Sequence, residues 1–211
     1  MNALNDGPDF EIVAFIHGHV GQSHLAKAMW EVICLPGDGV LYFPILLPIG
    51  IAAWYTGYFP DLNREQEYLL AYLYVVLVVD LLLNFTLKGI FKRQRPSFHK
   101  DDMRFPGPDK YSFPSGHGTR AGALVALFSA LLQFEPELLS LATAGLTSRT
   151  STSTCLTAAW TWAAINSFGR LALGRHFVSD VVLGTAIGYA LFFPVAQCVM
   201  YWTFPPSVLA N

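Results

Sequence analysis

Three short segments contain the residues whose types and spacing could do chemistry. They are KGIFKRQRP, which starts at Lys88 and includes Arg95, PSGH, which starts at Pro114, and GRLALGRHFVSD, which starts at Gly169. An arginine presents a planar fork of donors that can hold two phosphate oxygens at once. A lysine near the end of an apolar helix is costly unless it is paired or functional, although it can also extend to the membrane interface. Such residues favour a phosphate-like anion or anionic lipid headgroups as the ligand, and a positive-inside topology signal is the alternative.

The second and third segments add groups that could bind an anion or move a proton. Ser115 and Gly116 come directly before His117 and an apolar run, where the first N–H groups of a helix and its dipole favour an anion. Ser115 alone could be an ordinary helix N-cap. His176 and Asp180 are four residues apart, one helical turn, so the carboxylate could accept the Nδ1–H of the imidazole. In isolation, a pair at this spacing is more often structural.

The composition indicates that these segments belong to a membrane protein. Hydrophobic residues make up 53% of the 211 residues and charged residues 13%, whereas soluble domains carry roughly 25% charged residues. A membrane-spanning helix needs about 20 mostly apolar residues. The stretches that come close to this standard are 39–59, with kinks expected at Pro44 and Pro48, then 68–91, 114–134 and 178–204, and the weaker 155–173. We therefore predict an all-α, integral-membrane helical bundle of about five or six spans.

The first part of the chain is too polar for an ordinary span. Residues 10–34 contain His17, His19 and His24, and we expect residues 1–36 to form an amphipathic, interfacial segment ahead of a membrane-embedded domain at 37–211. The three histidines have no acidic or cysteine partner at ligand spacing. The sequence therefore predicts no metal, no cofactor and no nucleic-acid partner, and it leaves the oligomeric state open.

The order of the predicted spans brings the three segments together. Lys88 ends one span and PSGH opens the next, which carries the chain to the far side of the membrane near residues 135–154. The following helix returns the chain and ends with Arg170, and His176 then opens the last span. All three segments are therefore expected on one face of the membrane.

In this order and at this spacing, the three segments resemble the signature of the type 2 phosphatidic acid phosphatase superfamily, which includes lipid phosphate phosphatases and vanadium haloperoxidases. The stretches KYSFPSGHGTRA and LGRHFVSDVVLG are most similar to polyisoprenoid diphosphate phosphatases, the group that includes presqualene diphosphate phosphatase. The resemblance covers about residues 68–188, more than half of the chain. It is more specific for the superfamily than for the subgroup.

The resemblance implies a role for each matching position. It implies that phosphate is bound by Lys88, Arg95, Ser115, Gly116 and Arg170, with His176 as the nucleophile, His117 as the general acid and Asp180 as the partner of the nucleophile. Hydrolysis would pass through a phosphohistidine without a metal, because fixed cations do the work that metal ions do in kinases. Family members usually carry Ser where this chain has Gly169, and we expect Gly169→Ser to alter activity little.

The predicted function is hydrolysis of a lipid phosphate by a membrane phosphatase. Isoprenoid mono- or diphosphates, such as presqualene or farnesyl diphosphate, are the expected substrates, and phosphatidate, lysophosphatidate or sphingosine phosphate are the alternatives. The hydrophobicity argues against a haloperoxidase, and the retention of His117 and His176 argues against a non-catalytic membrane scaffold. The expected partners are the lipid phosphate substrate and membrane lipids. The expected location is the endoplasmic reticulum or another endomembrane, and the face that carries the site is left open.

Overall fold

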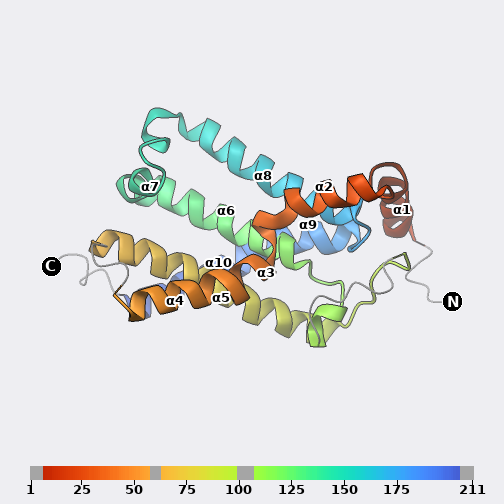
Figure 1. Ribbon diagram of the computed structural model, residues 1–211, viewed down its shortest axis with the longest axis horizontal. Helices are drawn as coiled ribbons and strands as arrows, with labels where there is room; N and C mark the ends of the chain where they lie inside the picture. Colours follow the sequence, from red (N-terminus) through yellow and green to blue (C-terminus); the bar gives the residue numbers. More distant parts are fainter. Residues whose placement is uncertain (1–6, 58–62, 99–106, 205–211) are drawn as a thin grey trace.

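The described part of the chain is helical, which confirms the all-α prediction. The computed structural model describes residues 7–57, 63–98 and 107–204, and these ranges contain no strand. The longer helices run along one common axis (Figure 1). The helices are α1 (Pro8–Val20), α2 (His24–Cys34), α3 (Gly39–Leu41), α4 (Leu47–Tyr55), α5 (Arg64–Phe91), α6 (Gly116–Phe134), α7 (Pro136–Ala142), α8 (Thr152–Ala172), α9 (Val178–Ile187) and α10 (Phe193–Thr203). Short 3-10 turns are η2 (Leu35–Gly37), η4 (Gly107–Lys110) and η5 (Thr147–Arg149).

Two of the predicted spans contain a π-helical turn just ahead of a proline. These turns are η3 (Tyr42–Leu46) and η6 (Gly188–Phe192). A proline has no N–H, and its ring collides with the carbonyl four positions earlier in an α-helix. Pro48 and Pro194 each place that carbonyl inside a π turn, where the wider backbone relieves the collision. The kinks predicted in residues 39–59 thus take the form of one π turn, and residues 58 and 59 of that span lie outside the described residues.

Helix α5 contains the most apolar stretch and presents its polar residues on one face. Asn63 caps the first turn through a capping box with Gln66, so the helix begins ahead of the apolar run that was predicted to start at residue 68. Asp80, Asn84 and Lys88 follow at a spacing of four, which puts them on one face of the helix. All three side chains are buried.

That face of α5 packs against α6. The Asp80 carboxylate lies 2.9 Å from the Arg120 guanidinium, and the Asn84 amide donates to the Thr119 hydroxyl at 3.1 Å. Polar groups in membrane helices are expensive unless another helix satisfies them. The polar residues of α5 therefore fix how α5 and α6 are placed relative to each other.

Helix α6 and the α9–η6 run approach each other closely. A Cβ added at Gly122 would lie 2.1 Å from the Thr185 carbonyl oxygen, and one at Gly188 would lie 1.9 Å from the Thr119 carbonyl oxygen. Any side chain at either position would collide with backbone, so this contact needs glycine on both sides. The close approach continues to the first turns of both helices, where a Cβ added at Gly118 would lie 2.9 Å from the Val181 carbonyl oxygen.

Several helices have the length and composition of membrane spans. By length and hydropathy alone, the described residues contain two such helices, Arg64–Phe91 and Val178–Thr203, or three if the bent pair His24–Gly37 and Tyr42–Ala53 is one broken span. Helices α6 and α8 have 19 and 21 residues, long enough for a core about 30 Å thick, but they are not apolar enough to be counted with those two. The prediction of an integral-membrane helical protein is confirmed, and the number of five or six spans stays a prediction.

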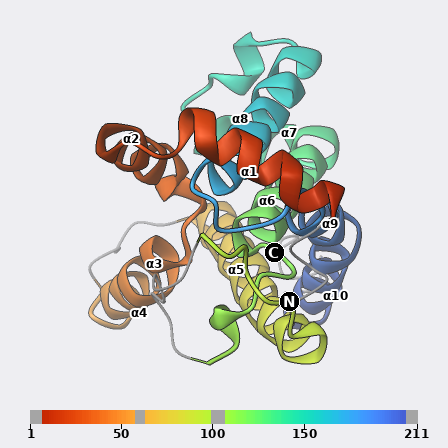
Figure 2. The same ribbon diagram turned by 90° about the vertical axis from the view of Figure 1, so that its right-hand side faces the viewer.

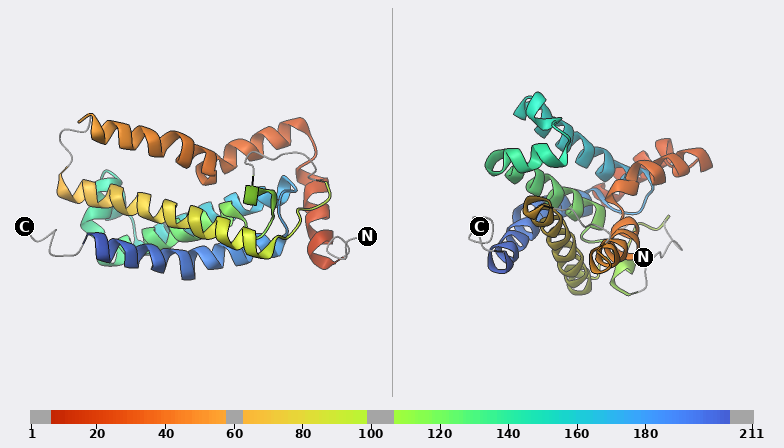
Figure 3. Two further views of the ribbon diagram at one scale, coloured as in Figure 1. Left: turned by 90° about the horizontal axis from the view of Figure 1, so that it is seen from below. Right: turned by 60° about the vertical axis from the view of Figure 1, so that its left-hand side comes forward.

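The N-terminal segment forms two helices where the sequence predicted a single interfacial segment. Helix α1 crosses one end of the bundle, and α2 runs beside α8 (Figures 1 and 2). Val13 of α1 packs with Leu171 and Val181 in a small buried cluster. Helix α4 runs alongside α5 at the edge of the molecule, where the Tyr74 hydroxyl donates to the Leu46 carbonyl at 3.1 Å (Figure 3). The division into an interfacial 1–36 and a membrane domain 37–211 stays a prediction, and residues 1–6 and 205–211 lie outside the described residues.

Candidate active site

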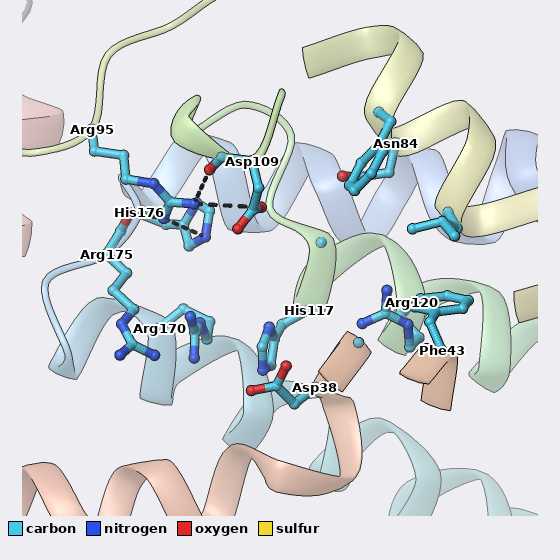
Figure 4. Close-up of a pocket in the computed structure, with 14 residues that line it drawn as sticks. Asp38, Phe43, Asn84, Arg95, Asp109, His117, Arg120, Arg170, Arg175 and His176 are labelled. Atoms are coloured by element: carbon cyan, nitrogen blue, oxygen red, sulfur yellow. Dashed lines mark hydrogen bonds and ion pairs between the residues drawn. The ribbon is translucent and has the colours of Figure 1, made fainter. Parts of the chain in front are cut away.

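A cavity of about 220 Å³ opens at the end of the bundle where the three sequence segments meet (Figure 4). The C-terminal ends of α5 and α8 and the N-terminal ends of α6 and α9 all lie at this end (Figure 1). Of the predicted site residues, the wall of this cavity contains Arg95, Gly116, His117, Arg170 and His176. The others, Lys88, Ser115 and Asp180, are buried behind the wall. The predicted convergence of the three segments on one end is confirmed.

His176 lies in the loop between α8 and α9 and presents one nitrogen to the cavity. Its Nδ1 is 2.8 Å from the Ser112 carbonyl oxygen, which can only accept, so Nδ1 carries the proton. A guanidinium N–H of Arg95 lies 3.3 Å from Nε2, which is then the unprotonated nitrogen. Burial, with the neighbouring Arg95 and Lys88 charges, holds the pKa of His176 well below its usual value. The imidazole is therefore neutral and keeps a lone pair at Nε2.

The hydrogen bond predicted between His176 and Asp180 is wrong. The Asp180 carboxylate lies 3.8 Å from Nδ1, and it accepts instead from the Phe177 backbone N–H at 2.9 Å and from Arg93 at 2.7 Å. The prediction assumed that both residues share a helix, but α9 begins only at Val178. Asp180 is thus a helix cap that holds the loop carrying His176, with its charge still close to the ring.

The first turn of α6 contributes His117 and the N-terminal end of a helix dipole. The Ser115 hydroxyl caps this helix by accepting from the Gly118 N–H at 3.3 Å, and the Ser115 N–H donates to the Asp180 carbonyl at 3.1 Å. Gly116 lies on the cavity wall at the start of the helix, where the dipole favours an anion. Ser115 therefore acts here as an N-cap, the role that the sequence left open.

The cations of the site are balanced by a carboxylate that the sequence did not single out. Asp109 of η4 lies 3.4 Å from the Lys88 ammonium and 3.6 Å from the Arg95 guanidinium. Lys88 also donates to the Tyr111 carbonyl at 2.7 Å, and its side chain is 1% exposed. Burial lowers the pKa of Arg95 to about 10, which leaves it cationic at neutral pH. An arriving phosphate would compete with Asp109 for these two cations.

Arg170 reaches the wall from the last turn of α8. The chain reverses directly after this helix at Gly174, whose φ of +69° is one that glycine adopts readily. The Arg175 N–H then bonds back to the Arg170 carbonyl at 3.0 Å, so His176 follows at once. Arg175 is held by Glu31 of α2, with oxygen–nitrogen distances of 2.5 and 3.2 Å. Arg170 and His176 are thus brought to one cavity by a single tight turn.

Gly169 faces α2 and not the cavity. A Cβ at residue 169 would lie 2.2 Å from the Cys34 sulfur and 3.2 Å from a Trp30 ring carbon. Residue 169 is also absent from the cavity wall. The hydroxyl expected from the family pattern would therefore meet α2, and the expectation that Gly169→Ser alters activity little stays a prediction, against which this packing argues.

The sequence analysis assigned no role to several residues of the site. Those on the cavity wall are Asp38, Asp109, Arg120 and Arg175. Arg93, inside KRQRP, pairs with Asp180 and with Asp9 of α1 instead of facing the cavity. Arg93 and Arg175 stand inside two of the three segments, Asp109 and Arg120 stand close to PSGH, and Asp38 is far from all three.

One side of the cavity is apolar. It is lined by Phe43 of η3 and by Leu81 and Phe85 of α5, next to the charged residues already described. A ligand with an anionic head and an apolar body would match both parts of this wall.

The histidines near the N-terminus do not form a metal site. The described residues contain no group of three or more His, Cys, Asp and Glu side chains placed to hold a metal ion. His17 stacks on Phe98 with ring centres 4.9 Å apart and bonds to the Ala172 carbonyl, and His19 bonds to the Phe15 carbonyl. These contacts give the two histidines roles in packing.

Comparisons with known proteins identify the family of this chain. The family model described as the PAP2 superfamily matches residues 68–204. A protein of Arabidopsis thaliana described as "Probable lipid phosphate phosphatase beta" is 31% identical over an alignment of 134 positions, and this alignment covers 53% of this chain and 57% of that protein. The match thus spans little more than half of that relative.

Two solved structures share the fold. One is a transmembrane PAP2 type phosphatidylglycerolphosphate phosphatase from Bacillus subtilis, with a TM-score of 0.61 and 23% identity over 94% of this chain and 87% of the other. The second is LpxE from Aquifex aeolicus, with a TM-score of 0.57 and 19% identity over 94% and 99% of the two chains.

Proposed function

This chain belongs to the PAP2 superfamily, and from that premise we propose that it is an integral-membrane lipid phosphatase with His176 as its nucleophile. The observation that carries the proposal is one cavity that joins a neutral histidine, a second histidine and the guanidinium groups of Arg95 and Arg170 beside an apolar wall. Those groups supply what transfer of a phosphoryl group from a lipid needs.

In the first step, Nε2 of His176 attacks phosphorus. Arg95, now 3.3 Å from Nε2, turns its N–H groups to the phosphate oxygens together with Arg170 and the first N–H groups of α6. The Ser112 carbonyl keeps Nδ1–H in place, so the ring becomes a cation as the N–P bond forms. The nearby Asp180 charge favours that cation.

His117 lies across the cavity from this nitrogen and serves as the general acid (Figure 4). It protonates the leaving oxygen and then takes a proton from the water that hydrolyses the phosphohistidine. A positioned acid–base group of this kind contributes about 10²–10⁴-fold. Lys88 and Ser115 support the cage from behind the wall, and no divalent metal enters the proposed mechanism.

For the substrate we propose an isoprenoid mono- or diphosphate, such as presqualene or farnesyl diphosphate, on the strength of the KYSFPSGHGTRA and LGRHFVSDVVLG stretches. Phe43, Leu81 and Phe85 offer its chain an apolar path. Phosphatidate, lysophosphatidate or sphingosine phosphate is the second candidate class, favoured by the lipid phosphate phosphatase name of the Arabidopsis relative. We place the protein in the endoplasmic reticulum or another endomembrane, with residues 1–36 as its interfacial segment.

The test is phosphate release from a panel of both lipid classes by the full chain in nanodiscs. Rapid quenching with radiolabelled substrate should trap a phosphohistidine in the wild type and none in His176→Ala. His19→Ala is the matched control, since it removes an exposed histidine that bonds only to its own helix. Equal phosphoenzyme in His176→Ala and His19→Ala would overturn the assignment, and faster turnover of phosphatidate would favour the second class.

A further inference from the structure

Asp38 brings a carboxylate to the site from a part of the chain outside the matched region 68–204. It follows the 3-10 turn η2, and its side chain is 7% exposed. In Figure 4 its carboxylate and the His117 imidazole point toward one another. The backbone agrees, because a Cβ at the preceding Gly37 would lie 3.1 Å from Cδ2 of His117. Asp38 is therefore placed against the proposed general acid.

The turn that carries Asp38 is held by a buried charge. Arg120 donates to the Gly37 carbonyl at 2.7 Å, and its other terminal nitrogen lies 2.9 Å from Asp80 of α5. The guanidinium carbon of Arg120 also lies 5.2 Å from the ring centre of Phe43, which follows the turn. Arg120 and His117 share the first turns of α6, so a shift of the turn relative to His117 would break these contacts. The packing of the bundle thus fixes the position of Asp38.

The charges around His117 explain why a carboxylate is needed beside its ring. Facing it from the other elements are Asp38 after η2, Asp109 of η4, Arg95 after α5, Arg170 of α8, and Arg175 and His176 of the loop before α9. Arg120 lies on its own helix, and Lys88 and Asp180 lie behind the wall. Asp109 is already engaged by Lys88 and Arg95. A surrounding of cations disfavours a protonated imidazole, and a carboxylate directly beside the ring offsets them.

We infer that Asp38 is the positioning residue of the general acid: it keeps His117 protonated before the reaction and directs its proton to the leaving oxygen. The inference rests on the proposed phosphatase function. In the first step the N–P bond to His176 forms, the bond from phosphorus to the leaving oxygen breaks, and the His117 proton moves to that oxygen. In the second step water gives a proton back to His117 and its oxygen to phosphorus, and the N–P bond breaks.

The consequence is a specific change in pH dependence. Without the carboxylate, His117 should lose its proton at lower pH, so the alkaline limb of kcat/KM for an alkyl phosphate should move down by about one to three pH units. Each pH unit of this shift corresponds to a tenfold lower kcat/KM on the alkaline side of the limb, while kcat/KM at acidic pH should be retained. An aryl phosphate, whose leaving group hardly needs a proton, should lose much less.

The variant is Asp38→Asn, which keeps the shape of the side chain, measured with an alkyl and an aryl phosphate across pH. Asp38→Glu should restore part of the alkaline limb, and Glu11→Gln, an exposed carboxylate on α1, is the control. An Asp38→Asn profile that matches Glu11→Gln with both substrates overturns the inference, as does an equal loss with both substrates at every pH.

A second measurement does not depend on turnover. The protonation of His117 in the full chain can be followed by NMR with labelled histidine, the signal being assigned by its loss in His117→Ala. Asp38→Asn should move that titration to lower pH, and an unmoved titration overturns the inference. Failure of the proposed function looks different: no phosphohistidine forms on His176 in the wild type, whatever His117 does.

Discussion

Replacing Gly169 by Ser should destabilise the protein, because residue 169 packs against α2. The added Cβ would meet the Cys34 sulfur at 2.2 Å, and ordinary contacts begin at 3.4 Å, so the sulfur must give way by about 1.2 Å. Trp30 stands 3.2 Å away on the same side and limits the movement. Overpacking of this kind costs about 1–3 kcal/mol of the free energy of unfolding.

The same change should also reduce activity through α2. Glu31 of this helix holds Arg175, and the turn that follows the helix carries Asp38. Pushing α2 away from α8 therefore disturbs two groups on the cavity wall. A Ser hydroxyl that merely added a phosphate contact would instead leave stability alone and raise activity.

Thermal unfolding in detergent and phosphate release distinguish these outcomes. The midpoint of Gly169→Ser should fall by roughly 2–12 °C, the range that about 1–3 kcal/mol gives for a chain of this size. Gly169→Ala adds the same Cβ without the hydroxyl and should fall about as far. The double variant Cys34→Ala with Gly169→Ser should recover part of the loss, because the atom in collision is gone. A Ser variant as stable as the wild type and more active than the Ala variant would refute the packing argument.

Four other outcomes are expected. Activity should persist well below pH 6.5 and fail only as pH drops through the lowered pKa of His176, since the nucleophile must be neutral; an acid limb of kcat/KM at or above 6.5 would contradict this. Vanadate should inhibit competitively, and Arg95→Lys and Arg170→Lys should each weaken it about 10- to 100-fold by removing a bidentate contact; unchanged inhibition constants would show that these guanidinium groups do not form the cage. Hydrolysis should survive EDTA, and activity that is lost in chelator and restored by Mg²⁺ would defeat the mechanism. Asp109→Asn should tighten inhibition by inorganic phosphate, because its carboxylate now holds Lys88 and Arg95; weaker inhibition would assign Asp109 a supporting role instead.

The helices and the meeting of the three segments could be predicted from sequence because both follow from hydropathy and chain order. A stretch of about 20 apolar residues dictates a helix, and successive spans alternate in direction, so the ends that carry Lys88, Ser115 and His176 must coincide. Neither inference requires knowledge of side-chain contacts. The starts of α5 and α6 were likewise open to prediction, since Asn63 and Ser115 are good N-caps.

The contacts that the sequence did not predict correctly are those between residues far apart in the sequence or just outside a helix. His176 misses Asp180 because α9 starts two residues after the histidine, and helix ends are uncertain by about that much from sequence. Gly169 meets Cys34, 135 positions earlier, through a packing of α2 on α8 that no local pattern encodes. Asp109 stood close to PSGH in the sequence, yet only the fold shows that its carboxylate lies between two cations of the cage.

Three carboxylates near the N-terminus each contact or face a basic group at the active end of the bundle. Asp9 of α1 binds Arg93, Glu31 of α2 binds Arg175, and Asp38 after η2 faces the proposed general acid. Each carboxylate thus reaches a different basic group at the active end of the bundle, and each comes from outside the matched region 68–204. Positive groups on the cavity wall repel one another before a phosphate binds, and Glu31 and Asp38 reduce that repulsion there, whereas Asp9 acts on Arg93 outside the cavity. On this argument, residues 7–38 help to assemble the site, in addition to any contact they make with the membrane surface.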